Sequence, residues 1–167
     1  MTLWSWLYLL WLGAGGLDFW LHRRSFIELT SGWRESWLHL LQIALLGAGV
    51  ILWLSVPPSL ALCLGLSVLV VVHAGVGYWD TRTAFPRRTI IPLEQHVHSI
   101  MDIAPWVALG ATCWPMVSGT AHAASSTPRP LGTWLFALLP GLLLGMLPAV
   151  FELHRCLRTA RLQRGLG

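Results

Sequence analysis

Long apolar runs alternate with short polar segments along the whole chain. Each run is close to the roughly 20 apolar residues that cross a bilayer as a helix. The runs predict five membrane-spanning helices, at residues 2–22, 34–56, 59–80, 93–117 and 132–153. Breakers such as "VPPS" and "TRTAFPRRTIIP" separate them. The pattern therefore predicts a single all-α domain that is integral to the membrane.

The composition agrees with this class. Hydrophobic residues make up 55% of the chain and charged residues 11%, whereas an ordinary soluble domain has about 25% charged residues. Every basic residue is an arginine, which excludes chemistry that needs a lysine Schiff base. We expect the lipid bilayer to be the main partner and expect no nucleic acid.

The arginines predict the orientation in the membrane. They cluster after spans one, three and five, and Arg129 alone lies on the other side. The positive-inside rule assigns the clusters to the cytoplasm. We therefore expect an external N-terminus and a cytoplasmic C-terminus, in a bacterial inner membrane. The three clusters are Arg23, Arg24 and Arg34; Arg82, Arg87 and Arg88; and Arg155, Arg158, Arg161 and Arg164.

The three cysteines, Cys63, Cys113 and Cys156, are scattered without a CxxC spacing. An odd, dispersed set argues against a disulfide framework and against a thiolate zinc site. Unpaired cysteine usually behaves as a small buried hydrophobe. We therefore expect three buried, unpaired cysteines.

Carboxylates and histidines gather in the cytoplasmic half. All seven acidic residues and six of the seven histidines lie there, and His122 falls in the outer loop. Residues four or seven apart share one face of a helix. Such spacings predict a four-helix bundle with a polar site in its cytoplasmic half. They relate Asp18 to His22, Glu35 to His39, His73 to Asp80, and Glu94 to His98 and Asp102.

Histidine together with carboxylate is a ligand set that suits iron, zinc or manganese. Charged groups inside a membrane are costly unless they are paired or bound to metal. We expect two metal ions, with iron favoured, zinc or manganese as alternatives, and haem less favoured. The predicted ligands are His22, Glu35, His39, His73, Asp80, Glu94, His98 and Asp102, with Asp18 and His96 in supporting positions.

Other polar residues have simpler interpretations. Glu28, Glu152 and His154 are expected at the surface or at an interface. Glu152 and His154 face opposite sides of span five, so at most one can join the site. Arg87 and Arg88 could bind lipid phosphate, although their role in setting the orientation explains them. Taken singly, a carboxylate in the first turn of a helix can also interact favourably with the positive end of the helix dipole.

A metal site in such a bundle predicts an enzyme for redox chemistry on a lipophilic substrate or quinol. The architecture is similar to that of diiron carboxylate proteins and of histidine-rich membrane desaturases and hydroxylases. The chain lacks their Glu-x-x-His and HxxHH motifs. The alternatives are a zinc-dependent membrane hydrolase and a non-catalytic subunit of a larger membrane complex that binds haem or pigment or relays protons. A small transporter is less favoured, because the polarity is confined to one half.

Overall fold

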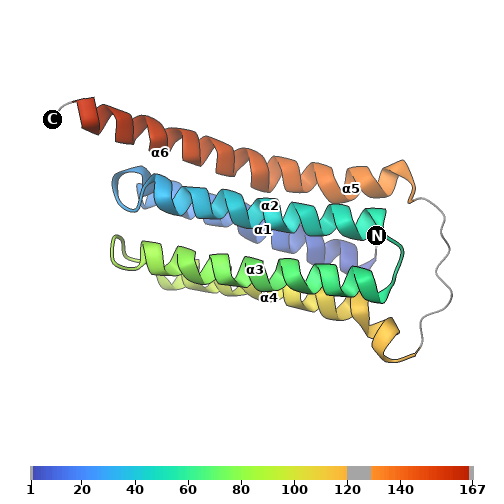
Figure 1. Cartoon of the computed structure of the whole chain (residues 1–167). Coiled ribbons are helices and arrows are strands. Elements are labelled where there is room, and N and C mark those ends of the chain that lie inside the picture. Colours follow the sequence, from blue (N-terminus) through green and yellow to red (C-terminus); the bar gives the residue numbers. More distant parts are fainter. Residues whose placement is uncertain (1, 120–128, 166–167) are drawn as a thin grey trace.

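The computed structural model describes residues 2–119 and 129–165, and this part of the chain is helical without any strand. His122 lies outside the described residues. A 3₁₀ turn, η1 (Ile27–Leu29), follows the first helix, and a π-helical turn, η2 (Leu142–Met146), joins the last two helices into one rod (Figure 1). The helices are α1 (Leu3–Arg24), α2 (Trp33–Ser55), α3 (Leu60–Ala84), α4 (Pro92–Val117), α5 (Leu131–Gly141) and α6 (Leu147–Gly165).

The helices agree closely with the apolar runs of the sequence. Four of them are long and apolar enough to cross a membrane, namely α2, α3, α4 and the rod Leu131–Gly165. The predicted first span, α1, has 22 residues but is not among these four. It contains four tryptophans, a tyrosine and Asp18, which make it less apolar than the others. A membrane crossing by α1 therefore stays a prediction.

Local signals explain where several helices begin. The side-chain oxygen of Thr2 accepts a hydrogen bond from the backbone N–H of Ser5 at 3.3 Å, and Ser59 caps Leu62 in the same way at 3.2 Å. Such caps satisfy N–H groups that have no partner inside the helix. Pro92 opens α4, where its missing N–H costs no hydrogen bond.

Prolines inside the spans do not end the helices. Pro105 and Pro115 lie within α4, and Pro140 lies within α5. Between Pro140 and Pro148 the hydrogen-bond pattern shifts to the π type at η2. Proline removes a backbone donor, and π turns are a common local adjustment within a long helix. The rod thus continues as far as Gly165, beyond the predicted end at residue 153.

The helices form a closed ring of five rods. α1 packs beside α4, α4 beside α3, and α3 beside α2, while the α5–α6 rod lies against both α2 and α1. In Figure 1 this rod covers one side of α1 and α2, and α3 and α4 cover the other. The sequence predicted a bundle of four helices around the polar site. In the structure the fifth rod closes the ring as well.

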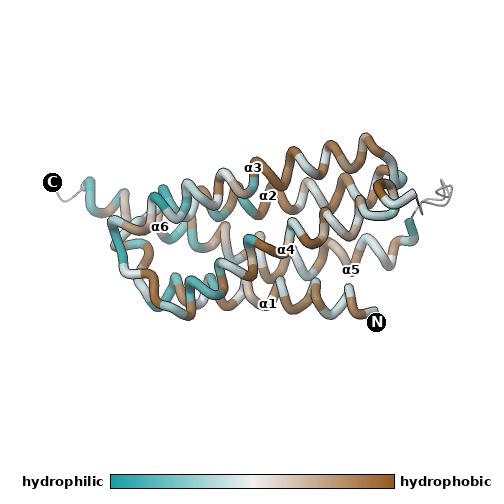
Figure 2. Tube along the Cα trace, turned by 90° about the horizontal axis from the view of Figure 1, so that it is seen from below, coloured by the Kyte–Doolittle hydropathy of each residue, from teal (hydrophilic) through white to brown (hydrophobic). Residues whose placement is uncertain are grey.

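Polarity is concentrated at one end of the ring, where α1, α3 and α6 end and α2 and α4 begin (Figure 2). We call it the polar end. Elsewhere the outer surface carries large exposed apolar side chains, such as Val68, Ile103 and Phe151, which are 60–70% exposed. A soluble monomer rarely exposes so much apolar surface. This distribution supports association with a membrane.

A disulfide joins Cys63 to Cys113, which corrects the expectation of three unpaired cysteines. The two residues are 50 positions apart, but α3 and α4 are antiparallel neighbours and bring their Cα atoms to 5.7 Å. The spacing along the chain could not reveal this pair, because it depends on which helices adjoin and in what register. Cys156 is free and buried.

The disulfide can be tested by counting thiols. We expect denatured, unreduced protein to gain one polymer chain from maleimide–polyethylene glycol, at Cys156, and three after reduction. A Cys63→Ser variant should gain two without reductant, because Cys113 is then released. Three polymer chains on unreduced wild-type protein, read from gel mobility, would contradict the pairing.

Candidate metal centre

Eight side chains from all five rods meet inside the polar end, and we call them the polar cluster. All are buried except His98, which is partly buried. Each helix of the ring supplies at least one carboxylate, so the ring closes around a highly charged interior. The polar cluster consists of Asp18 and His22 from α1, Glu35 and His39 from α2, Asp80 from α3, Glu94 and His98 from α4, and Glu152 from α6.

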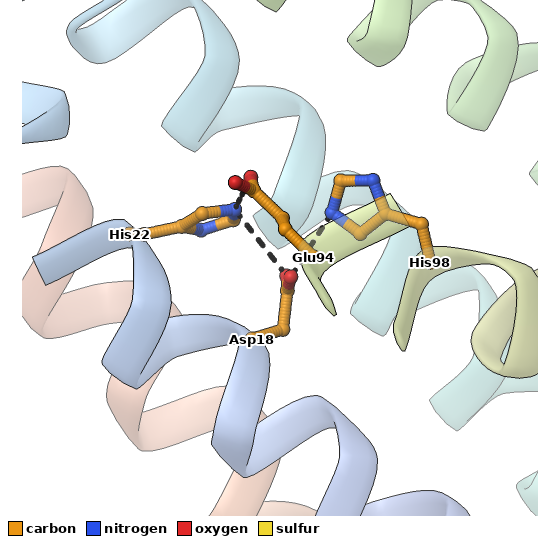
Figure 3. Close-up of side chains that lie close together, drawn as sticks. All are labelled: Asp18, His22, Glu94 and His98. Carbon is orange, nitrogen blue, oxygen red and sulfur yellow. Dashed lines mark ion pairs between the residues drawn. The ribbon is translucent and has the colours of Figure 1, made fainter. Parts of the chain in front are cut away.

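One group within the polar cluster joins α1 to α4 (Figure 3). The Nε2 atom of His22 lies 3.5 Å from Oδ2 of Asp18 and 3.4 Å from Oε1 of Glu94. The Nε2 atom of His98 lies 3.0 Å from Oδ1 of Asp18. One ligand atom from each of the four residues lies within 4.8 Å of the others. Metal bonds to such atoms are about 2.0–2.2 Å long, so small side-chain movements would suffice to hold one ion.

A second group joins α2 to α3. The Nε2 atom of His39 lies 3.2 Å from Oδ2 of Asp80 and 3.7 Å from Oε1 of Glu35. All three residues are buried, and their ligand atoms also lie within 4.8 Å of one another. This group could hold a second ion, separate from the first.

Glu152 lies between the two groups. Its Oε1 atom accepts a hydrogen bond from Nδ1 of His39 at 2.8 Å, and its Oε2 atom lies 3.3 Å from Nδ1 of His22. The two imidazole rings are stacked, with centroids 4.5 Å apart and planes 11° from parallel. These three residues also form a group that could hold an ion. With Glu152 on the Nδ1 side of both rings, each Nε2 atom faces its own set of carboxylates.

Several buried ligand atoms make no hydrogen bond within the described part of the chain. They include Nε2 of His22 and of His39, the two atoms that face the carboxylate sets. A buried polar atom without a partner costs about 1–3 kcal/mol, and such atoms in a native structure often indicate a water or an ion. The others in the two groups are Nδ1 of His22, Oδ1 of Asp18, Oδ1 of Asp80 and Oε1 of Glu94. Of these, Oδ1 of Asp18 and Oε1 of Glu94 each lie within ion-pair distance of a basic side chain, so the indication of an ion comes from the histidine nitrogens and Asp80.

Arg88 also belongs to this region, and the predicted site did not include it. It lies in the loop before α4, yet its side chain is 2% exposed. Its Nε and Nη2 atoms donate hydrogen bonds to Oε1 of Glu35 at 3.1 and 2.6 Å, and its Nη1 atom lies 2.5 Å from Oε1 of Glu94. Burial lowers the pKa of Arg88, but the hydrogen bonds and charges of the two glutamates outweigh burial and raise that pKa.

No signal in the sequence separates Arg88 from its neighbour Arg87, which is exposed. Both fit the rule that arginines flank spans on the cytoplasmic side. The difference arises from the turn after α3, which directs one of the two side chains inward between α2 and α4. Arg88 therefore has a structural role in addition to any role in setting the orientation.

Three predicted site residues lie outside the polar cluster. His73 is seven residues before Asp80, and Asp102 is eight after Glu94, so both lie roughly 10–12 Å deeper along their helices. They line a cavity there. His96 is exposed, and its Nδ1 atom bonds the backbone carbonyl four residues earlier at 2.9 Å. Asp18, predicted in a supporting position, lies instead among the candidate ligands.

Glu152, expected at the surface or at an interface and absent from the predicted site, is 5% exposed and lies at the centre of the polar cluster. His154, on the opposite face of α6, is exposed. The sequence indicated that at most one of the two could face inward but could not tell which. Glu28, the third residue expected at the surface or at an interface, is partly buried and forms an ion pair with Arg155 at 3.2 Å.

Comparisons with family models, with curated proteins and with solved structures gave no match for this chain. The functional interpretation therefore depends on the geometry and chemistry of the polar cluster. That geometry establishes buried groups of histidines and carboxylates that could hold a metal, inside a bundle of apolar helices.

Proposed function

We propose that this chain is a membrane-embedded protein with two metal ions, iron favoured, that carries out redox chemistry on a lipophilic substrate. The observation that carries the proposal is the pair of stacked histidines, whose Nε2 atoms face two separate sets of carboxylates. One ion would be held by Asp18, His22, Glu94 and His98, and the other by Glu35, His39 and Asp80.

The charge of the buried region supports two divalent ions. Among the described residues, five buried carboxylates and one buried arginine, Arg88, leave four negative charges when the histidines are neutral. Two divalent cations would bring the region to neutrality. Uncompensated charge inside a membrane protein is costly, so a compensating charge is expected. The carboxylates are Asp18, Glu35, Asp80, Glu94 and Glu152.

The alternative is that protons on the histidines supply the positive charge, as in a proton relay. That arrangement would place two parallel imidazolium rings with centroids 4.5 Å apart. Two like charges at 4 Å repel by about 4 kcal/mol at an effective dielectric constant of 20. Repulsion between the stacked rings opposes this alternative, whereas the carboxylates around both rings favour it. Metal content distinguishes the two.

Mixed nitrogen and oxygen ligands suit iron, manganese and zinc, and iron adds redox chemistry. Bound iron would supply the redox capacity for such a reaction, in which an alcohol or a hydroquinone loses two electrons and two protons when it is oxidised. Asp102 and His73, which line the cavity and are not candidate metal ligands, can accept those protons. The electrons would pass on to a membrane quinone or to dioxygen. With zinc, the same residues would instead support hydrolysis.

The disulfide supports the proposed orientation. Cys63 and Cys113 lie at the opposite end of α3 and α4 from the polar end. Disulfides persist in oxidising compartments and are rare in the cytosol. The arginine clusters lie at the polar end, as the positive-inside rule requires of a cytoplasmic face. We propose that the polar cluster lies near the cytoplasmic face of a bacterial inner membrane.

Metal analysis of protein purified without chelators tests the proposal. We expect about two ions per chain, mostly iron, from a site of this ligand number. His39→Ala should lose at least one of them, because it removes a ligand of the second group. The matched control is His96→Ala, which alters an exposed histidine and should keep both ions. Wild-type protein without stoichiometric metal would show that the proposal is wrong, and a Soret band would indicate haem instead.

A further inference from the structure

A cavity of about 500 Å³ lies inside the ring, next to the polar cluster. All five rods contribute to its wall. At one end it is lined by four members of the polar cluster, Asp18, His39, Asp80 and His98. From there it extends past His73 and Asp102 into the apolar part of the bundle. The candidate metal ligands are therefore reached from the interior of the ring.

The part of the cavity away from the polar cluster is apolar. Trp11 of α1, Leu46 and Val50 of α2, and Trp134 and Leu138 of α5 are among its lining residues. This combination of a long apolar chamber with a few polar groups at one end is typical of sites for small lipophilic molecules. The chamber fits a molecule with an apolar chain and a single polar end.

Glycine keeps this chamber open. Gly47 lies in its wall, and a Cβ atom added there would meet nothing within 4 Å. A side chain at this position would therefore extend into free space. By contrast, Gly75 on α3 also has nothing within 4 Å but is exposed and does not line the cavity. A larger residue at Gly47 would fill the cavity, whereas the same residue at Gly75 would leave the cavity unchanged.

The charges of the wall select the polar end of the ligand. Three aspartates line the cavity, Asp18, Asp80 and Asp102, and no arginine is among the described residues that line it. In metal-free protein, a ligand carboxylate would meet these charges without a permanent cation to pair with. An uncharged hydroxyl group can instead donate a hydrogen bond to a carboxylate or to Gln42, which also lines the cavity.

We propose that this cavity binds a lipophilic alcohol or phenol, with the hydroxyl group beside Asp18, Asp80 and His98 and the apolar chain along Trp11, Leu46 and Val50. The inference deepens the proposed function and rests on it in one respect, that the hydroxyl group is the one oxidised. Binding itself needs the cavity and its charges, so it can be measured on protein with or without metal.

The test uses full-length protein in lipid nanodiscs and 11-bromoundecanol, whose bromine quenches nearby tryptophans. Trp11 and Trp134 line the chamber, so we expect a saturable quenching component. Gly47→Leu should weaken this binding at least tenfold, whereas Gly75→Leu should bind as the wild type does. Equal binding by the two variants would overturn the proposal.

A charged probe tests the selection of the polar end. At pH 8, 11-bromoundecanoate carries a carboxylate on the same brominated chain. We expect it to bind metal-free protein at least tenfold more weakly than the alcohol does. Equal or tighter binding of the acid would overturn the assignment of an uncharged hydroxyl group.

Displacement experiments distinguish the two sources of a hydroxyl group. If decylhydroquinone displaces the brominated alcohol at lower concentration than dodecanol does, the ligand is a hydroquinone; the reverse order assigns an alkyl alcohol. Failure of both to displace it would overturn the proposal.

Metal content measured on the same samples separates this inference from the proposed function. Saturable binding to metal-free protein would support ligand binding in the cavity but not the metal centre. Bound metal without saturable binding would refute ligand binding in the cavity and leave the metal centre standing.

Discussion

Replacing Arg88 with methionine is expected to lower the free energy of unfolding by about 3–5 kcal/mol, the usual effect of removing one partner from a buried ion pair. The guanidinium contacts Glu35 and Glu94 at 2.6 and 2.5 Å, and both carboxylates are at most 2% exposed. Methionine keeps much of the side-chain volume but supplies no charge. Two buried carboxylates would then lose their permanent cation. Denaturant unfolding in mixed micelles measures the change.

Two further variants identify the cause. Arg87→Met alters the exposed neighbour of Arg88 and should leave the stability nearly unchanged. The double variant with Arg88→Met and Glu35→Gln should recover part of the loss, because one of the unpaired charges is removed. Equal stability of the two single variants, or a double variant no more stable than Arg88→Met, would show that the ion pairs do not hold this end of the ring together.

Replacing Glu152 with glutamine is expected to weaken metal binding by about 10- to 100-fold, the usual effect of removing a carboxylate that orients a ligating histidine. Glu152 faces the Nδ1 atoms of His22 and His39 at 3.3 and 2.8 Å. A ring that donates through Nδ1 presents Nε2 as the free lone pair for a metal. Glutamine preserves the size of the side chain but removes the charge that favours this arrangement in both rings. Titration against a chelator measures the affinity.

His154→Gln is the matched control, because His154 lies two residues further along α6 and is exposed. It should bind metal as tightly as the wild type. If Glu152→Gln also binds normally, the orienting role is wrong. If Glu152→Gln instead loses metal as completely as His39→Ala does, Glu152 is a direct ligand, in keeping with the group that it forms with the two histidines.

The positions of the helices could be predicted because they follow from local properties of the chain. Apolar runs of membrane-spanning length are separated by breakers, and Pro92 suits the first position of a helix. The periodicity of a helix also placed Asp18 with His22, and Glu35 with His39, on single faces. The structure keeps both pairs together, with Nε2 of each histidine 3.5 and 3.7 Å from its carboxylate.

The depth of the site was harder to predict. His73 lies on the same helix face as Asp80, and Asp102 lies on the same face as Glu94. Helical periodicity does not distinguish the deeper residue of each pair from the shallower one. Two helical turns separate each pair, however, and a group of ligand atoms spans less than that length. The structure therefore divides a single stripe of polar residues into a polar cluster and the wall of a cavity.

By itself the sequence determined the helical class, the approximate positions of the helices and the residues that share one face of each helix, because these depend on neighbours within about two turns. The tertiary structure alone decided the order of the helices around the ring and the rotation of each about its axis. The order and rotation of the helices place Glu152 between the histidines, direct Arg88 inward and bring Cys63 next to Cys113. Each of these contacts joins residues on different helices or in the loops between them, where helical periodicity carries no information.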